Sequence, residues 1–203
     1  MIGTLTLISA LSVAAILPEE AAVAKATSLS GKEVAFEKNG NNVKISGYDG
    51  KVVVLEWWNF ECPYVVKHYD NSTNMQKLQK EFTDKGVVWL TINSSAAGKQ
   101  GHVSAEKAKE LGKAKGANWT DVLLDHSGVV GKMFDAKTTP HMIIIDKDGS
   151  IKYDGAIDSN RSADAGTIPG ATNYVREALN AVLAGKPVAT AKTQPYGCSV
   201  KYP

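Results

Sequence analysis

The residues best suited to chemistry in this chain of 203 residues are its two cysteines. Cys62 stands just beyond the apolar run Val52–Trp58 and directly before Pro63. Because proline lacks an N–H and suits the first turn of a helix, Pro63 predicts a helix that Cys62 caps. Backbone N–H groups at a helix N-terminus stabilise a thiolate, so we expect Cys62 to have a lowered pKa and a nucleophilic sulfur. The alternative is a buried and unreactive cysteine.

Cys198 is the second cysteine and lies in a C-terminal segment without hydrophobic periodicity. A thiolate that attacks a disulfide needs a second thiol to release the mixed disulfide, so Cys198 is the candidate resolving thiol for Cys62. A bond between the two would close a long loop, worth about 5 kcal/mol in the chain-entropy model. Three alternatives stay open: a structural disulfide that never turns over, a bridge to another molecule, and no pairing at all.

The elements that must position Cys62 alternate between strands and helices. Val52–Trp58 is nearly all apolar, as in a strand buried on both faces of a mixed or parallel sheet, and Val87–Ile92 repeats the pattern. Between them, apolar residues at helical spacing predict one long helix over 65–82, kinked at the polar step 71–73. Strand, helix and strand in this order predict a right-handed βαβ unit.

Turn and cap signals complete the expected architecture. The turn Asn39–Asn42 lies between two short strand patterns, which predicts a hairpin at the edge of the sheet. Ser104 predicts the cap of a helix that ends at Lys115, and the loop 93–102 before it is expected at the carboxyl edge of the sheet. The other predicted elements are strands over 121–125, 142–146 and 150–154, and helices over 129–134 and 173–184.

Around its central cysteine the chain resembles the thioredoxin superfamily, in particular the periplasmic thioredoxin-like and redoxin proteins of the alkyl hydroperoxide reductase and thiol-specific antioxidant family. Those proteins carry an apolar strand, a tryptophan and then Cys-x-x-Cys opening a helix, and Trp58, Cys62 and Pro63 stand in matching places. The resemblance implies an α/β thioredoxin-like fold, a central mixed β-sheet flanked by helices, here with an N-terminal β-hairpin extension. Two residues depart from the pattern: Glu61 replaces a tryptophan, and Val65 replaces the second cysteine.

The resemblance also implies roles for individual residues. Glu56 matches a buried carboxylate that assists proton transfer, and Thr139-Pro140 resembles the cis-proline loop that lies against the reactive cysteine and positions the substrate sulfur. Cys198 stands in a Gly-Cys-Ser sequence similar to that of redoxin relatives whose helix lacks the second cysteine. The expected catalytic residues are Cys62, Cys198, Glu56 and Pro140, and those expected to position the substrate are Asn59, Pro63 and Thr139.

These residues predict a thiol-disulfide oxidoreductase that acts on protein or small-molecule thiols and disulfides and needs no cofactor. The first alternative is a peroxidase with peroxide as its substrate. Peroxiredoxins carry Thr or Ser three residues before the cysteine and an arginine across the site; here Asn59 would have to donate that hydrogen bond and Lys137 supply the charge. A copper chaperone or a non-catalytic binding module are further alternatives. His68 does not share a helix face with Cys62, and no metal site is expected.

Length and composition indicate one soluble globular domain, and a formal net charge of +2 gives no reason to expect nucleic acid as a partner. The uncharged run Ile2–Leu17, followed by small residues that a signal peptidase accepts, resembles a secretory signal and is too short to span a membrane comfortably. We expect a signal peptide over 1–26, a thioredoxin-like domain over 27–187 and a tail over 188–203. The mature protein would be periplasmic or secreted, without stable membrane insertion, where disulfides persist and antioxidant activity is useful.

Overall fold

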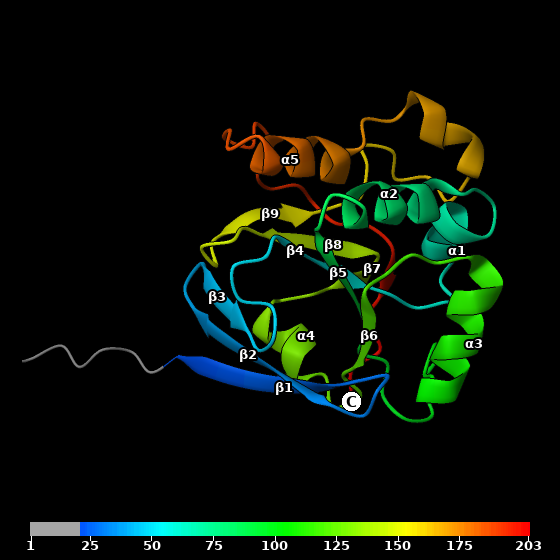
Figure 1. The fold of residues 1–203 in the computed structure, drawn as a ribbon. Coiled ribbons are helices and arrows are strands. Elements are labelled where there is room, and N and C mark those ends of the chain that lie inside the picture. The colour runs from blue at the N-terminus through cyan, green and yellow to red at the C-terminus, as the bar shows by residue number, and fades with distance from the viewer. Residues whose placement is uncertain (1–20) are drawn as a thin grey trace, which may run out of the picture.

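The computed structural model describes residues 21–203, so the apolar run expected to be a secretory signal lies outside the described residues. In the described part, an eight-stranded sheet has the order β3-β2-β1-β6-β5-β4-β8-β9 (Figure 1). Its strands are β1 (Ala22–Ser28), β2 (Glu33–Asn39), β3 (Asn42–Ile45), β4 (Val53–Trp57), β5 (Val88–Asn93), β6 (Asp121–Leu124), β8 (His141–Ile145) and β9 (Ile151–Gly155). A separate two-stranded sheet joins β7 (Thr138–Thr139) to β10 (Cys198–Ser199).

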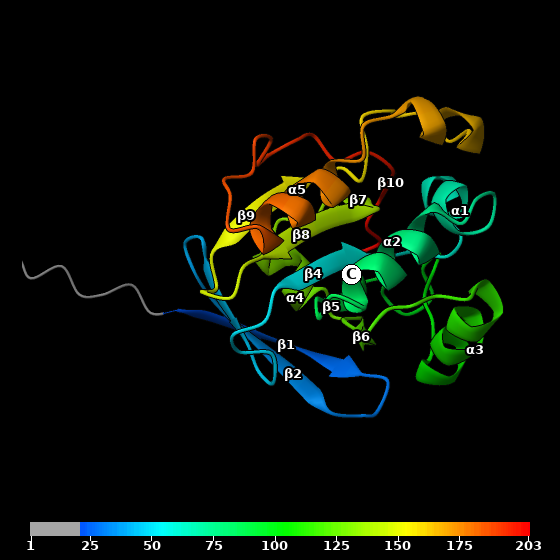
Figure 2. The same ribbon diagram turned by 45° about the horizontal axis from the view of Figure 1, so that its top comes forward.

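Five α-helices are described around this sheet. They are α1 (Pro63–Tyr69), α2 (Asn74–Thr83), α3 (Ala105–Lys115), α4 (Val129–Met133) and α5 (Tyr174–Leu183), with a 3-10 helix at Ala165–Gly170. Helices α1, α2 and α5 cover one face of the sheet, and α4 covers the other (Figures 1 and 2). The predicted α/β fold, with a mixed sheet, flanking helices and an N-terminal hairpin, is therefore confirmed.

Strand β4 is central because it pairs with β5 in parallel and with β8 antiparallel. All five of its residues are buried, as the continuous apolar run predicted. Its side chains alternate between two cores, since Val54 packs with α2 and α5 whereas Val53 and Leu55 pack toward α4. The same alternation directs Glu56 to the side of α1 and α2.

Two sequence predictions need correction. The helix expected over 65–82 is two helices, because the hydroxyl of Ser72 donates to the Lys67 carbonyl oxygen and accepts from the Asn74 N–H, which ends α1 and orients the chain into α2. The domain boundary placed after residue 26 falls inside β1, whose residues pair with β2 and β6. The folded domain therefore begins earlier than predicted.

The segment 188–203 lies along the rest of the protein, with Tyr196 buried and its other residues partly or fully exposed. It runs from the end of α5, passes β7, and ends beside α4 on the opposite face of the sheet (Figure 1). Its strand β10 pairs antiparallel with β7, with Cys198 opposite Thr139. Beyond β10, the Tyr202 hydroxyl donates to the Ala136 carbonyl oxygen at 2.7 Å. The tail thus brings the second cysteine to the sheet edge where α1 begins.

Candidate active site

Cys62 is the N-cap residue of α1, with Pro63 in the first turn, as the sequence predicted. Its side chain is fully buried, and its thiol donates a hydrogen bond to the Thr139 carbonyl oxygen at 3.0 Å. The Thr139 hydroxyl is also buried and has no hydrogen-bond partner within residues 21–203. A thiolate at Cys62 would accept from this hydroxyl, which lowers the pKa of Cys62, but would no longer donate to the Thr139 carbonyl oxygen.

Cys198 is held beside Cys62 because it pairs with Thr139, the residue that contacts the Cys62 thiol. Both cysteines are free thiols in this structure. Cys198 is partly exposed, whereas Cys62 is closed off from solvent. The tail therefore covers one sulfur with a segment that carries the other.

The two thiols have pKa values shifted in opposite directions. Burial raises the pKa of Cys62, but hydrogen bonds from the side chains of Cys198 and Thr139 and from backbone N–H groups outweigh it, so the pKa is lowered overall. Burial, together with the negative charge of Cys62, raises the pKa of Cys198 to about 12. Cys62 is therefore the more acidic thiol of the pair. The helix N-terminus was the reason given by the sequence, whereas the Cys198 thiol supplies a main part of the effect.

Glu56 is a fully buried carboxyl group on β4. It accepts hydrogen bonds from four neutral groups: the hydroxyl of Tyr69 at 2.8 Å, the indole of Trp89 at 2.7 Å, the amide of Gln79 at 3.2 Å and the hydroxyl of Thr91 at 3.4 Å. Burial raises its pKa to about 7, although these bonds act in the opposite direction. A carboxyl group that titrates near neutrality can take up or release a proton.

The predicted site residues lie in two neighbouring places. Thr139-Pro140 is a cis peptide, and Thr139 contacts the Cys62 thiol directly. Glu56 has no hydrogen bond to Cys62 in the described structure, and it contacts that cysteine's helix through the hydrogen bond that it accepts from the Tyr69 hydroxyl on α1. The structure thus brings Cys62, Thr139, Pro140 and Cys198 together, with Glu56 below α1.

Comparison with known proteins identifies the family of this arrangement. A model of the Redoxin family matches residues 21–173. The chain belongs to the Redoxin family. Two solved structures share its fold: a hypothetical protein of Sinorhizobium meliloti 1021, with 23% identity and a TM-score of 0.69 over 94% of this chain and 97% of that one, and an uncharacterized conserved protein of Geobacillus kaustophilus, with 26% identity and a TM-score of 0.66 over 91% of each. No curated protein gives a significant match.

Asn59 has a different surrounding from the one expected of a peroxidase residue. In this redoxin its side chain accepts from the Glu61 N–H at 2.9 Å and donates to the Gln100 carbonyl oxygen at 3.3 Å. Both polar atoms thus order the loops around Cys62. Lys137, the expected source of positive charge, is exposed and pairs with Asp135 at 3.0 Å. The hydrogen bond and the charge that a peroxidase needs are directed away from the sulfur.

Sequence reasoning missed a buried charged cluster next to this site in the redoxin. Lys67 on α1 and Asp158 after β9 are almost fully buried and form an ion pair at 3.5 Å, and Tyr196 of the tail contacts both. No sequence signal marked them, because lysine and aspartate are usually solvated and Asp158 lies in a polar loop. The one hint of this cluster in the sequence was Tyr196, an aromatic residue two positions before Cys198.

Between residues 21 and 203, no three histidine, cysteine or acidic side chains are grouped as metal ligands. His102 and His126 lie with their ring centroids 4.1 Å apart, without a third such residue. Over the same residues, no helix has the length and apolar character required to cross a bilayer.

Proposed function

We propose that this redoxin is a thiol-disulfide oxidoreductase in which Cys62 is the nucleophile and Cys198 the resolving thiol. Family membership supports oxidoreductase chemistry in general. The observation that carries the specific proposal is the pairing of β10 with β7, which places the tail cysteine against the buried one. This position replaces the missing second cysteine of α1, where Val65 stands.

The reaction begins with the Cys62 thiolate. It attacks one sulfur of a substrate disulfide, a new bond forms between Cys62 and that sulfur, and the other substrate sulfur leaves as a thiolate that takes a proton. Cys198 then loses its proton and attacks Cys62, which releases the second substrate thiol and leaves a bond between Cys62 and Cys198. The substrate is reduced by two electrons, and the two cysteines are oxidised by two. The reverse sequence oxidises a substrate dithiol.

Neighbouring residues have defined parts in this proposal. Thr139 donates its hydroxyl to the thiolate, and Pro140 shapes the loop against which a substrate sulfur lies. Pro63 starts α1 without requiring an N–H partner, and Asn59 orders the loop around the sulfur. Glu56 accepts or supplies the proton, because its pKa of about 7 allows both states near neutral pH.

Treatment of the reduced protein with oxidised glutathione tests this function. Mass spectrometry with peptide mapping should find a bond between Cys62 and Cys198, and the Cys198→Ser variant should instead accumulate glutathione on Cys62. The Cys62→Ser variant is the matched control and should give neither product. An unreactive Cys62 in the native protein would overturn the proposal, whereas a sulfenic acid on Cys62 after dilute peroxide would favour the peroxidase.

An exported location is part of the proposal, because a reversible disulfide is expected where the surroundings are oxidising. The sequence that supports it lies outside the described residues. N-terminal sequencing of the mature protein tests it, and we expect a new terminus before β1. A terminus inside β1 would remove residues that pair with β2 and β6.

A further inference from the structure

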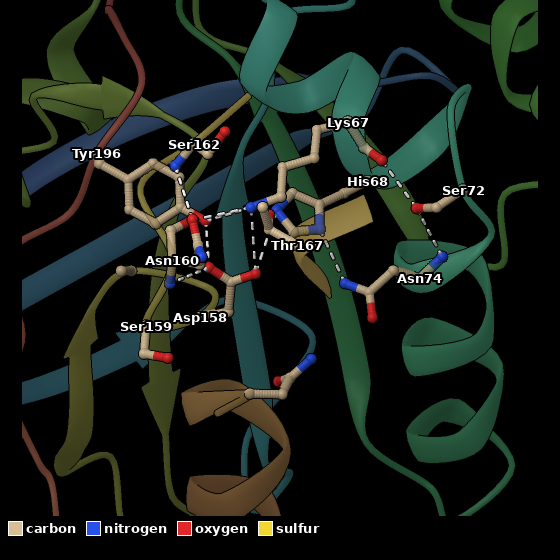
Figure 3. A network of polar contacts seen from close by, with 12 residues as sticks. Lys67, His68, Ser72, Asn74, Asp158, Ser159, Asn160, Ser162, Thr167 and Tyr196 are labelled. Carbon is tan, nitrogen blue, oxygen red and sulfur yellow. Dashed lines mark hydrogen bonds and ion pairs between the residues drawn. The ribbon is translucent and has the colours of Figure 1, made fainter. Parts of the chain in front are cut away.

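A cluster of buried charges connects the helix of Cys62 to the tail of Cys198. Lys67 on α1 has no exposed surface, and Figure 3 shows its side chain meeting residues from two other segments. Its ammonium group lies 2.9 Å from the Asn160 carbonyl oxygen, 3.5 Å from an Asp158 carboxylate oxygen and 3.4 Å from the Tyr196 hydroxyl. Each segment that packs here thus contributes at least one oxygen.

Tyr196 is the member of this cluster that belongs to the tail. Its hydroxyl donates to Asp158, and the carboxylate of Asp158 also accepts from the Asn160 N–H at 3.0 Å. The Tyr196 ring lies 5.5 Å below the Lys67 ammonium and meets the ring of Tyr64, also on α1, edge to face at 5.8 Å. The hydroxyl and the ring therefore both tie the tail to α1.

The ion pair at the centre of this cluster is costly to bury, because both charges lose their hydration. Their mutual attraction offsets that loss of free energy only when the geometry is good. The reaction proposed above uses neither Lys67 nor Asp158. Their position suggests another purpose, because α1 begins at Cys62 and Tyr196 lies two residues before Cys198. Between Tyr196 and Cys198, Gly197 brings the backbone so close that a β-carbon would lie 2.0 Å from the Thr139 carbonyl oxygen.

We propose that Lys67, Asp158 and Tyr196 are positioning residues that hold Cys198 against Cys62 and so raise the effective concentration of the resolving thiol. The inference rests on the proposed function, because it gives these residues a part in the same thiol pair. A tail bound at one point only would sample many positions. A tail fixed immediately before Cys198 loses little further conformational entropy when the disulfide forms. The cluster does not touch the substrate.

The test is the equilibrium between the protein and a glutathione buffer. One molecule of oxidised glutathione oxidises the two protein thiols to the Cys62–Cys198 disulfide and gives two molecules of reduced glutathione, with two electrons transferred. The equilibrium constant of this reaction measures the effective concentration of Cys198 at Cys62. It is obtained from acid-quenched samples by mass spectrometry after the free thiols have been alkylated.

Tyr196→Phe is the informative variant, because it keeps the buried ring and removes the hydroxyl. We expect its equilibrium constant to fall about tenfold, the effect of losing one hydrogen bond to a charged group. Tyr202→Phe is the matched control, since Tyr202 is also a tail tyrosine that donates its hydroxyl, but to Ala136 near α4. We expect it to change the constant less than about twofold.

A second readout separates positioning from general loosening of the tail. The Cys198 thiol helps to lower the pKa of Cys62. The pH midpoint of Cys62 alkylation should therefore shift to higher pH in Tyr196→Phe and remain unchanged in Tyr202→Phe. Equal constants for Tyr196→Phe and the wild type, or equal losses in both tyrosine variants, would overturn the inference while leaving the proposed function intact. Absence of the disulfide in the wild type would instead overturn the proposed function.

Discussion

Two buried polar clusters adjoin α1, and each encloses a carboxyl group in a different way. Glu56 is surrounded by neutral donors alone, which offset the cost of burying its charge only in part, so its pKa rises to about 7. Asp158 lies against the Lys67 ammonium, which balances its charge. The first cluster can therefore exchange a proton near neutral pH, whereas the second is suited to a fixed structural contact. A buried carboxyl group becomes a proton carrier or an anchor according to whether a cation is buried with it.

The largest expected effect comes from removing one charge of the second cluster. Lys67→Met leaves Asp158 without its cation, and Asp158→Asn leaves Lys67 without its anion. Each single variant should lower the free energy of unfolding by about 3 to 5 kcal/mol, because an uncompensated charge remains buried. The double variant should lose clearly less than the sum of the two. Urea denaturation of the four proteins measures this, and simple additivity would show that the charges are not coupled.

The cluster around Glu56 should make the stability of the protein depend on pH. The pKa of Glu56 is about 7 in the folded protein, whereas the ordinary pKa of an exposed glutamate is 4.5, so the unfolded chain loses this proton first as the pH rises. Glu56 therefore lowers stability progressively from about pH 4.5 to about pH 7, by about 3 kcal/mol in total. Glu56→Gln removes this titration and should gain stability relative to the wild type across that window.

Unfolding free energies of the wild type and Glu56→Gln at about pH 5 and about pH 8 test this prediction. Asp158→Asn is the comparison, because its carboxylate is paired with a cation. A stability difference between wild type and Glu56→Gln that stays constant with pH would mean that Glu56 does not titrate in this window, and its assignment as the proton carrier would be lost.

The close approach at Gly197 should have a smaller effect on stability and a clear effect on the site. Gly197 has φ of 142°, and a β-carbon there would overlap the Thr139 carbonyl oxygen. Gly197→Ala should therefore displace β10, cost about 2 kcal/mol and make Cys62 more accessible to alkylation. Gly185→Ala is the control, because its φ is 64° but no atom lies within 4 Å. Unchanged alkylation of Cys62 in Gly197→Ala would show that β10 does not cover the sulfur.

The sequence predicted the features that depend on local patterns. Continuous apolar residues marked β4 and β5, and Pro63 marked the start of α1 and so the place of Cys62. The Ser104 cap and its helix were also predicted correctly, since a capping hydroxyl and the apolar spacing lie within a few residues of each other. The burial of Glu56 followed from the apolar residues on both sides of it in the strand.

Features formed by distant segments were not predictable in the same way. The two-residue strand β10 exists only because β7 lies beside it, and neither has a strand pattern of its own. Lys67 belongs to a helix where a lysine normally faces solvent, and Asp158 belongs to a loop, so their burial together depends on the complete fold. The contact between the cluster of Lys67 and Asp158 and the tail is therefore a tertiary property. The sequence identified Cys198 but not the residues that hold it in place.

The smallest effect, and the finest test of the comparison, concerns Tyr69, whose hydroxyl donates to Glu56 at 2.8 Å. Tyr69→Phe should destabilise the protein more at about pH 8 than at about pH 5, with a difference of about 1 kcal/mol, because the lost hydrogen bond is stronger when Glu56 is ionised. Tyr153→Phe is the matched control, since that buried hydroxyl donates to the carbonyl oxygen of Ala156, which carries no charge. Urea denaturation at both pH values measures the two losses. If Tyr69→Phe and Tyr153→Phe show the same pH dependence, the donors around Glu56 do not distinguish its two protonation states, and burial alone sets its pKa.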